Sequence, residues 1–238
     1  MDTRYFKFAD LVSGNSPAAR QFRTMYETAA SFDEPRIVEL GTRQGMSTTC
    51  FLTACEERGG QVVSIDIVDC SDVSDSPLVT FVQCDSADTK AARQKAPIVT
   101  AGIDLLFIDA MHNAAAVERD LTAWFGYVKI GGVIMLHDVD PLLYRRGARK
   151  DSWLVEHELS EVFSYLYRLF AANEDKLEFR VDYGLTGLAT MRRTALGDLK
   201  PPVPSFRRSP LSRLRASVLS MKESLKGGLG GATRRPVG

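Results

Sequence analysis

Short apolar runs alternate with amphipathic and polar stretches along most of the chain. Each of five runs is bounded by glycine, proline or polar residues, which favours a buried strand. These runs are 36–40, 61–67, 78–83, 103–108 and 133–136. Apolar positions at helical spacing and capping residues indicate helices before and between the strands. The predicted helices are 17–31, 47–58, 86–95, 114–129 and 153–171.

Turn residues set the ends of the last elements. Gly131 and Gly132 are expected to end the helix over 114–129 before the fifth strand begins. The turn sequence Asp182-Tyr183-Gly184 is a hairpin signal between two further apolar runs. The two strands of this hairpin are predicted at 177–181 and 185–191.

Strands that alternate with helices are typical of βαβ units, whose crossovers are right-handed. The sequence therefore predicts an α/β fold: a Rossmann-like, doubly wound, mostly parallel sheet with an antiparallel C-terminal hairpin strand. We expect an N-terminal helical extension over 1–34, a ligand-binding domain over 35–199 and a basic Pro/Gly-rich tail over 200–238. In such sheets ligands bind beyond the carboxyl ends of the strands, so the residues directly after each strand are the candidates for function.

Composition and charge restrict the class of protein. The 238 residues are 45% hydrophobic and 25% charged, which is typical of a soluble globular protein. Basic and acidic residues balance at 30 each, but nine basic residues and one acid lie in 200–238, so the body is mildly acidic. This argues against nucleic acid as the main partner. No apolar run reaches the roughly 18 residues of a membrane span, and the N-terminus lacks a signal-peptide pattern, so we expect a cytoplasmic protein.

The cysteines give no sign of a metal site or a disulfide framework. None of Cys50, Cys55, Cys70 and Cys84 lies in a CxxC pair, and the chain has three histidines, so a structural zinc site is not expected. We expect reduced thiols, mostly in the core, as in a reducing compartment.

The first predicted strand runs into a turn that contains Gly41 and Gly45. Glycine lets the backbone approach a ligand closely, and the N-terminus of the next helix presents free N–H groups to it. The two glycines alone are equally compatible with a plain strand-to-helix connection. Their spacing is not GxGxxG, so the nicotinamide-dinucleotide fingerprint is absent.

Acidic residues follow the second and third predicted strands. Asp66 ends the second strand, where a carboxylate can accept both hydroxyls of a ribose or can simply be solvated. Asp85 follows the third strand, where it would meet an adenine amino group or cap the next helix. Both alternatives stay open for each residue.

Two acids and two histidines follow the fourth and fifth strands. Asp109 and Asp138 offer the carboxylate oxygens that a hard cation such as Mg²⁺ prefers. His137 is a third candidate ligand, and a histidine would favour Mn²⁺, Fe²⁺ or Zn²⁺. His112 suits a general base, because the pKa of imidazole lies near neutral pH. Each histidine alone is compatible with a structural role, but two of them beside strand-end acids favour one shared site.

These residues carry a resemblance to a known family. The segments ELGTRQGMST, SID, CDSAD, FIDAMH and GGVIMLHD, within about 35–192, resemble the class I S-adenosylmethionine-dependent methyltransferases. They are most similar to methyltransferase family 24, a branch of metal-dependent sugar and small-molecule O-methyltransferases and relatives of cephalosporin hydroxylase. The chain departs from that pattern at Ala110, where a glycine is usual, and at Asn113-Ala114, where an aromatic residue is common. These departures concern the acceptor pocket more than the cofactor.

The resemblance implies a role for each strand-end residue. S-adenosylmethionine would contact Glu39, Gly41, Thr42, Gly45, Ser47, Asp66, Asp85, Ser86 and Asp109, with Asp66 at the ribose and Asp85 facing the adenine. A divalent metal, Mg²⁺ in the first instance, would be bound by Asp109, His137 and Asp138. His112 would act as the base, and Asp109 would be the second catalytic residue.

The function implied is metal-assisted O-methylation of a hydroxyl on a small molecule such as a sugar, a glycolipid or a natural product. Metal and base together would deprotonate the hydroxyl, whose oxygen then attacks the sulfonium methyl group. One alternative is an NAD-dependent oxidoreductase on a similar fold, which the absence of GxGxxG disfavours. Another is a non-catalytic protein that binds S-adenosylmethionine or a partner, against which the intact set of Asp109, His112 and Asp138 argues.

The C-terminal tail has a pattern of its own. Residues 209–226 combine apolar positions at three- and four-residue steps with flanking Lys and Arg, which predicts a basic amphipathic helix. Such a helix would make a peripheral contact with an anionic membrane or a protein, or would pack on its own domain. We also expect a weakly held homo-oligomer. In the loop after the fifth strand, Arg145 or Arg146 would hold an anionic group of the acceptor or would simply be solvated.

Overall fold

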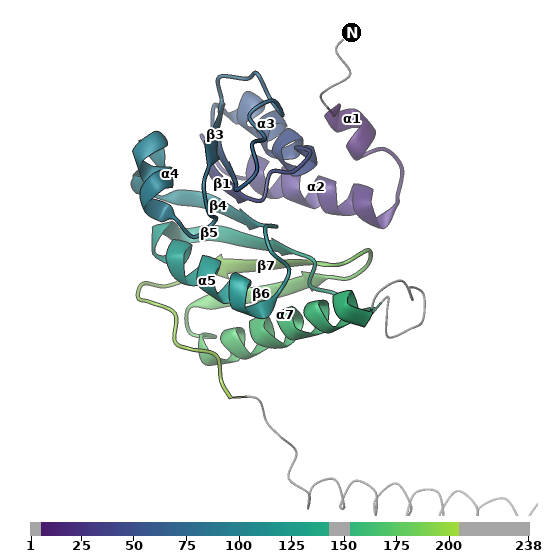
Figure 1. Cartoon of the computed structure of the whole chain (residues 1–238), viewed down its shortest axis with the longest axis vertical. Coiled ribbons are helices and arrows are strands. Elements are labelled where there is room, and N and C mark those ends of the chain that lie inside the picture. The colour runs from purple at the N-terminus through teal and green to yellow at the C-terminus, as the bar shows by residue number, and fades with distance from the viewer. Residues whose placement is uncertain (1–5, 143–152, 205–238) are drawn as a thin grey trace, which may run out of the picture. The chain divides into compact units, whose positions relative to one another are not determined.

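The structure is a computed structural model that describes residues 6–142 and 153–204 (Figure 1). The chain divides into a first unit, Met1–Val203, and a second unit, Pro204–Gly238. The predicted tail helix over 209–226 and the loop residues Arg145 and Arg146 lie outside the described residues. No helix in the described ranges is both long and apolar enough to cross a bilayer.

The described part of the first unit contains a seven-stranded sheet of order β3-β2-β1-β4-β5-β7-β6 (Figure 1). Its strands are β1 (Arg36–Leu40), β2 (Gln61–Asp66), β3 (Val79–Gln83), β4 (Ile103–Ile108), β5 (Val128–His137), β6 (Leu177–Asp182) and β7 (Leu188–Arg193). The first five are parallel, and β7 pairs antiparallel with both β5 and β6. The predicted fold class is therefore confirmed, with the second hairpin strand inserted beside β5.

Helices cover both faces of the sheet (Figure 1). On one face lie α1 (Phe8–Leu11), α2 (Pro17–Ala30) and α3 (Met46–Arg58), and on the other α4 (Thr89–Lys95), α5 (Ala114–Trp124) and α7 (Trp153–Ala172). Short 3-10 turns lie at Pro97–Ala101 and Phe125–Tyr127. Helix α2 begins as predicted, because Ser16 accepts a hydrogen bond from the Ala19 N–H at 3.1 Å and Pro17 occupies the first turn.

The alternation of side chains along β1 decides which residues face which helices. Ile37 belongs to the core between the sheet and α2 and α3, whereas Val38 and Leu40 belong to the core beneath α4, α5 and α7. Successive strand residues point to opposite faces, so Glu39 points to the same side as Ile37, beneath α3. The four cysteines are free thiols, and Cys50, Cys55 and Cys70 are buried, as expected.

The predicted helix over 114–129 is wrong in its second half. Helix α5 ends at Trp124, and β5 starts at Val128, before the two glycines that were expected to end the helix. Gly131 adopts φ +82° at a register shift between β4 and β5, so the glycines form an irregularity inside a strand.

Two other boundaries differ from the prediction. The helix predicted over 86–95 is α4, which starts at Thr89. The Asp88 side chain accepts a hydrogen bond from the Ala91 N–H and so caps this helix, which means that Asp85 is not the cap. The last strand starts at Leu188 rather than residue 185, because Leu185 (φ +54°) and Gly187 (φ +80°) belong to the turn.

Candidate functional site

The carboxyl ends of the parallel strands border two cavities. The first, of about 390 Å³, lies between the turn after β1, the end of β5 and helix α2. Its polar lining residues are Gln21, Thr42, Arg43, Gln44, Ser47, Asp109, His137 and Asp138. The second, of about 320 Å³, extends to the ends of β2 and β3 and is lined by Asp66, Asp85, Ser86 and Arg119 among others. Both cavities are also bordered by Gly41, Arg43 and Asp109, so most of the predicted site residues lie around one shared point.

Glu39 lies beneath the turn rather than in a cavity. It is 0% exposed, and its carboxylate accepts hydrogen bonds from the hydroxyls of Ser47 (2.5 Å), Thr48 (2.6 Å) and Ser64 (2.5 Å). Burial raises its pKa to about 7, against the lowering effect of these hydrogen bonds. Among the described residues that line the cavities, Ser47 is present and Glu39 is not. Glu39 therefore anchors the start of α3 to the sheet.

Gly41 and Asp66 fix the turn after β1. Gly41 has φ +99°, and a Cβ at this position would clash with the backbone carbonyl of Asp109. Asp66 Oδ2 accepts from the backbone N–H groups of Thr42 (3.0 Å) and Arg43 (3.1 Å), and Oδ1 accepts from that of Val68 at 2.9 Å. A carboxylate has about four acceptor positions, so these bonds leave about one open, on Oδ1. The other predicted turn residue, Gly45, has φ +79° and caps α3 without lining either cavity.

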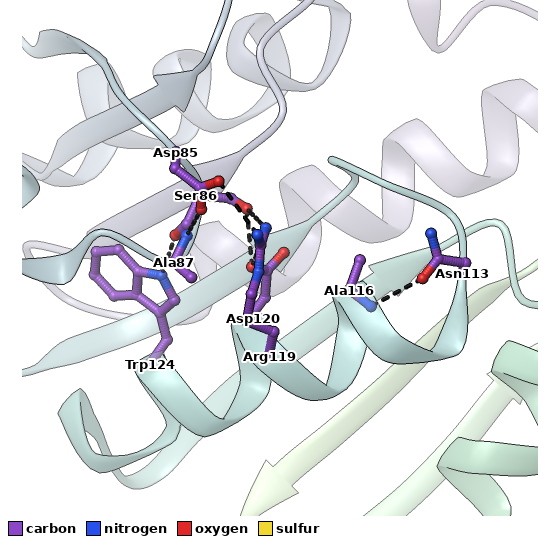
Figure 2. Close-up of polar contacts among 8 residues, drawn as sticks. All are labelled: Asp85, Ser86, Ala87, Asn113, Ala116, Arg119, Asp120 and Trp124. Carbon is purple, nitrogen blue, oxygen red and sulfur yellow. Dashed lines mark hydrogen bonds and ion pairs between the residues drawn. The ribbon is translucent and has the colours of Figure 1, made fainter.

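Figure 2 shows a polar cluster in which α5 holds the loop after β3. Arg119 Nη1 lies 3.2 Å from Asp85 Oδ2, and Arg119 Nη2 donates to Ser86 Oγ at 3.0 Å. Ser86 Oγ also donates to Asp120 Oδ1 at 2.8 Å, and the Ser86 carbonyl accepts from the Trp124 indole at 2.6 Å. Burial raises the pKa of Asp120, whose Oδ2 lacks a hydrogen-bond partner among the described residues. Arg119, which the sequence analysis did not single out, thus holds Asp85 at the wall of the second cavity.

Asp109, His137 and Asp138 converge at the ends of β4 and β5. One ligand atom from each of them lies within 4.8 Å of the others. His137 Nδ1 is 3.3 Å from Asp109 Oδ1 and 3.2 Å from Asp138 Oδ1. Consecutive strand residues normally point to opposite faces, but Asp138 has φ +57°, which breaks this alternation at the end of β5. The strain at this position lets adjacent side chains share one centre.

His112 completes this group of acids and histidines. Its Nδ1 lies 2.7 Å from Asp138 Oδ2, and its Nε2 lies 3.8 Å from Asp109 Oδ1. Burial lowers the pKa of both His112 and His137. The hydrogen bonds to the carboxylates and the negative charges have the opposite, larger combined effect, so the pKa of each histidine is raised. Burial also opposes ionisation of Asp138, yet the hydrogen bond from His112 and the charges of His137 and His112 bring its pKa to about 2.

Helix α2 contributes Gln21, a residue that no sequence motif predicted. The Gln21 side chain is buried and lies with its Oε1 3.2 Å from His137 Nε2. The contact joins positions 116 apart in the chain, so no local motif indicates it. The available signal is that Gln21, Met25 and Ala29 are buried at four-residue steps, which places a polar residue on the apolar face of a helix.

Residues 38–139 match the model of a family described as a methyltransferase domain. The matched segment begins in β1 and ends directly after Asp138, so it includes the strand ends that border both cavities. This part of the chain is therefore similar to a methyltransferase domain, and the strand order is that of the predicted Rossmann-like fold. The resemblance stated from the sequence is therefore confirmed, while α2 and the β6–β7 hairpin lie outside the matched segment.

Solved structures of methyltransferases are similar to this chain. MycE methyltransferase from the mycinamycin biosynthetic pathway, in complex with Mg and SAH, has 17% identity and a TM-score of 0.52 over 80% of this chain and 52% of that one. A putative caffeoyl-CoA O-methyltransferase from Staphylococcus aureus has 16% identity and a TM-score of 0.56 over 78% and 88%. The O-methyltransferase TomG from Streptomyces achromogenes, in complex with SAM, has 19% identity and a TM-score of 0.54 over 74% of this chain and 81% of that one. This chain spans about half the length of MycE, and at these identities the likeness shows the fold.

Proposed function

We propose that the chain is an S-adenosylmethionine-dependent O-methyltransferase that uses a divalent cation to methylate a hydroxyl group of a small molecule. The observation that carries this proposal is the convergence of Asp109, His137 and Asp138 between two cavities at the sheet edge. The methyltransferase family match supports methyl transfer. The similar structures of MycE with Mg and SAH, and of TomG with SAM, support the two cofactors.

The second cavity is the proposed place for the nucleoside. Asp66 would accept one ribose hydroxyl at its open Oδ1 position, since its other acceptor positions hold the turn. Asp85 and Ser86, held by Arg119, would face the adenine. Gly41, Thr42, Ser47 and Asp109 border the first cavity, where the rest of the cofactor would lie, and Glu39 and Gly45 would act by shaping the turn.

The three converging side chains suit a divalent cation by their chemistry. Two carboxylates and one imidazole nitrogen are ligands for Mg²⁺ or, because a histidine is present, for Mn²⁺. We assign Asp109, His137 and Asp138 as these ligands. A cation bound there would polarise an acceptor hydroxyl and lower its pKa.

His112 is the proposed general base. Its Nδ1 faces Asp138 at 2.7 Å, so a neutral His112 that donates from Nδ1 keeps Nε2 free to accept a proton. Asp138 would orient the imidazole and stabilise its positive charge after proton transfer. With S-adenosylmethionine bound, the acceptor oxygen would form a bond to the methyl carbon as the bond from that carbon to sulfur breaks, and the site would contribute mainly orientation.

The first cavity is the proposed acceptor pocket. It is also lined by apolar side chains, namely Ala18, Phe22, Met25, Met46, Phe107 and Leu185. An apolar wall beside the hydroxyl-binding centre suits a sugar with an apolar substituent, a glycolipid or a natural product. Weak self-association, a cytoplasmic location and a membrane or protein contact through 209–226 stay predictions.

A thermal-shift experiment tests this function before the acceptor is known. S-adenosylmethionine and S-adenosylhomocysteine should raise the Tm, and NAD should not, because a ligand that binds the folded state stabilises it. Mn²⁺ should add a further increase that EDTA reverses. The variant Asp66→Ala should lose the nucleoside effect and keep the Mn²⁺ effect. Stabilisation by NAD alone would contradict the proposal.

Methyl transfer itself is tested with labelled S-adenosylmethionine and a panel of hydroxylated small molecules, analysed by mass spectrometry. An O-methyltransferase should add one methyl group at a hydroxyl oxygen. Transfer to nitrogen or carbon would leave a methyltransferase but remove the oxygen specificity. Binding of S-adenosylmethionine without transfer to any acceptor would favour the non-catalytic alternative.

A further inference from the structure

Gln21 bridges two parts of the site through its side-chain amide. Its Nε2 donates to the carbonyl of Gly184 at 3.0 Å, and its Oε1 lies 3.2 Å from His137 Nε2. A carbonyl accepts hydrogen bonds only, so the NH₂ end of the amide must face Gly184. The oxygen end therefore faces the imidazole. Because Gln21 is 6% exposed, little water competes for this contact.

The direction of this bridge determines which nitrogen of His137 carries a proton. Gln21 Oε1 accepts a hydrogen bond, so His137 Nε2 must donate one and be protonated. In a neutral imidazole the lone pair then lies on Nδ1. Nδ1 is the atom that faces Asp109 Oδ1 at 3.3 Å and Asp138 Oδ1 at 3.2 Å. These carboxylates attract a proton to Nδ1 as well. A cation bound between them would replace that proton on Nδ1, provided that the proton on Nε2 is retained, and Gln21 Oε1 is the acceptor that retains it.

The carbonyl that holds Gln21 belongs to a turn that is itself fixed by hydrogen bonds. The Gly184 carbonyl that it contacts also accepts from the Gly187 N–H at 2.9 Å, within the turn between β6 and β7. Asp140 ties this turn to the end of β5, because its Oδ2 accepts from the Gly184 N–H at 3.1 Å and its own N–H donates to the Thr186 carbonyl at 2.7 Å. Asp140 is 1% exposed and lies two residues after Asp138. The side-chain amide of Gln21 is thus held both by its position on α2 and by its hydrogen bond to the β6–β7 turn.

We propose that Gln21 is a positioning residue of the candidate metal centre, which keeps His137 Nε2 protonated and directs Nδ1 toward Asp109 and Asp138. Ligating histidines generally depend on such a partner for their second nitrogen. This inference rests on the proposed function, since it concerns the same centre. It also gives α2, which lies outside the segment 38–139, a part in the chemistry.

The state of His137 is measured directly by nitrogen-15 NMR of the metal-free protein. The chain has three histidines, so the ring signals can be assigned with the variants His112→Gln and His157→Gln. At about pH 9, where an ordinary imidazole is neutral, His137 Nε2 should be protonated in the wild-type protein. In Gln21→Met, which has a similar volume and no acceptor oxygen, the proton should move to Nδ1.

Two further variants separate positioning from folding. Gln21→Glu keeps an acceptor opposite His137, so Nε2 should remain protonated. Gln83→Met is the matched control, because Gln83 also donates to a backbone carbonyl, that of Ile67 at 3.2 Å, at the end of β3. It should leave His137 unchanged. A protonated Nε2 in Gln21→Met, or the same shift in Gln83→Met, would overturn the proposal.

Metal affinity supplies the second readout. The Kd for Mn²⁺, measured by electron paramagnetic resonance, should rise by about tenfold in Gln21→Met, the usual scale for the loss of a partner that orients a ligand. It should change little in Gln21→Glu and Gln83→Met. Equal Kd values in wild type and Gln21→Met would overturn the proposal. A wild-type protein that binds no Mn²⁺ would instead overturn the metal part of the proposed function, and the imidazole signals would still decide the role of Gln21.

Discussion

His112 and Asp138 form a close pair across the ends of β4 and β5, with Nδ1 of the imidazole 2.7 Å from Oδ2 of the carboxylate. The other oxygen of Asp138 faces His137 at 3.2 Å. One carboxylate is thus shared between the proposed base and a proposed metal ligand. Since its pKa lies at about 2, Asp138 stays ionised for both tasks at any working pH.

Replacement of His112 tests its role as the base. We expect His112→Gln to lower the rate of methyl transfer by about 10²–10⁴-fold, the usual contribution of a general base. The Kd for S-adenosylhomocysteine, measured by calorimetry, should be nearly unchanged, because His112 does not line the second cavity, the proposed place for the nucleoside. His157→Gln is the control, since His157 is exposed on α7 and pairs with Glu161. Equal rates for both variants would remove His112 from the mechanism.

Metal binding should weaken in acid. The pKa of His137 is raised, because its hydrogen bond and the carboxylate charges outweigh burial, so protonation competes with the metal at a higher pH than for an ordinary histidine of pKa about 6.5. The Kd for Mn²⁺ should therefore rise as the pH falls through that raised pKa, while Asp138 remains ionised. In His137→Asp this dependence should be much weaker. A Kd in the wild-type protein that is constant between about pH 5 and about pH 8 would argue against His137 as a ligand.

Glu39 should make folding stability depend on pH. Its pKa rises from 4.5 to about 7 in the folded protein, so the folded state binds this proton more tightly than the unfolded state. The free energy of unfolding should therefore decrease as the pH rises from about 4.5 to about 7. Urea titrations of wild type and Glu39→Gln should show this decrease in the wild type and its loss in the variant. Glu56→Gln, on the exposed side of α3, should behave like the wild type.

The requirement for glycine at position 41 can be separated from the general effect of positive φ. Gly41→Ala should cost more than about 3 kcal/mol, because it adds a backbone clash with Asp109 to the strain of φ +99°. Gly14→Ala, at φ +73° with nothing within 4 Å of the added Cβ, should cost about 1 kcal/mol. Chemical denaturation measures both. Similar values for the two variants would mean that the close approach to β4 relaxes easily.

The sequence predicts the central elements well where burial leaves no alternative. All six residues of β4, Ile103–Ile108, are buried, and the apolar run has the same bounds in sequence and structure. The failure after Trp124 has a physical cause: Val128 continues the helical spacing of Val117, Leu121 and Trp124, yet it is buried as the first residue of β5. A buried valine fits either element, so periodicity alone cannot separate them.

The residues of the candidate site also divide into those that the sequence predicts and those that it does not. Strand-end residues such as Asp109 and Asp138 are predictable, because parallel strands bring their carboxyl ends to one edge of the sheet. Arg119 and Gln21 are not, because they reach the site from helices through side chains whose partners are distant in the chain. The sequence also does not show that most acceptor positions of Asp66 bind backbone N–H groups of the turn. Nor does it show that Arg119 forms an ion pair with Asp85.

The insertion of β7 beside β5 has a consequence for any shortened form of this protein. A fragment ending near residue 139 would leave β5 as the sheet border, with the backbone groups of 133–137 deprived of their antiparallel neighbour. Those five positions read Val-Ile-Met-Leu-His, and the first four are buried. An unprotected, strongly apolar border strand invites pairing between molecules. The segment 38–139 would therefore tend to aggregate by itself, because the strand that covers the border of β5 lies outside it.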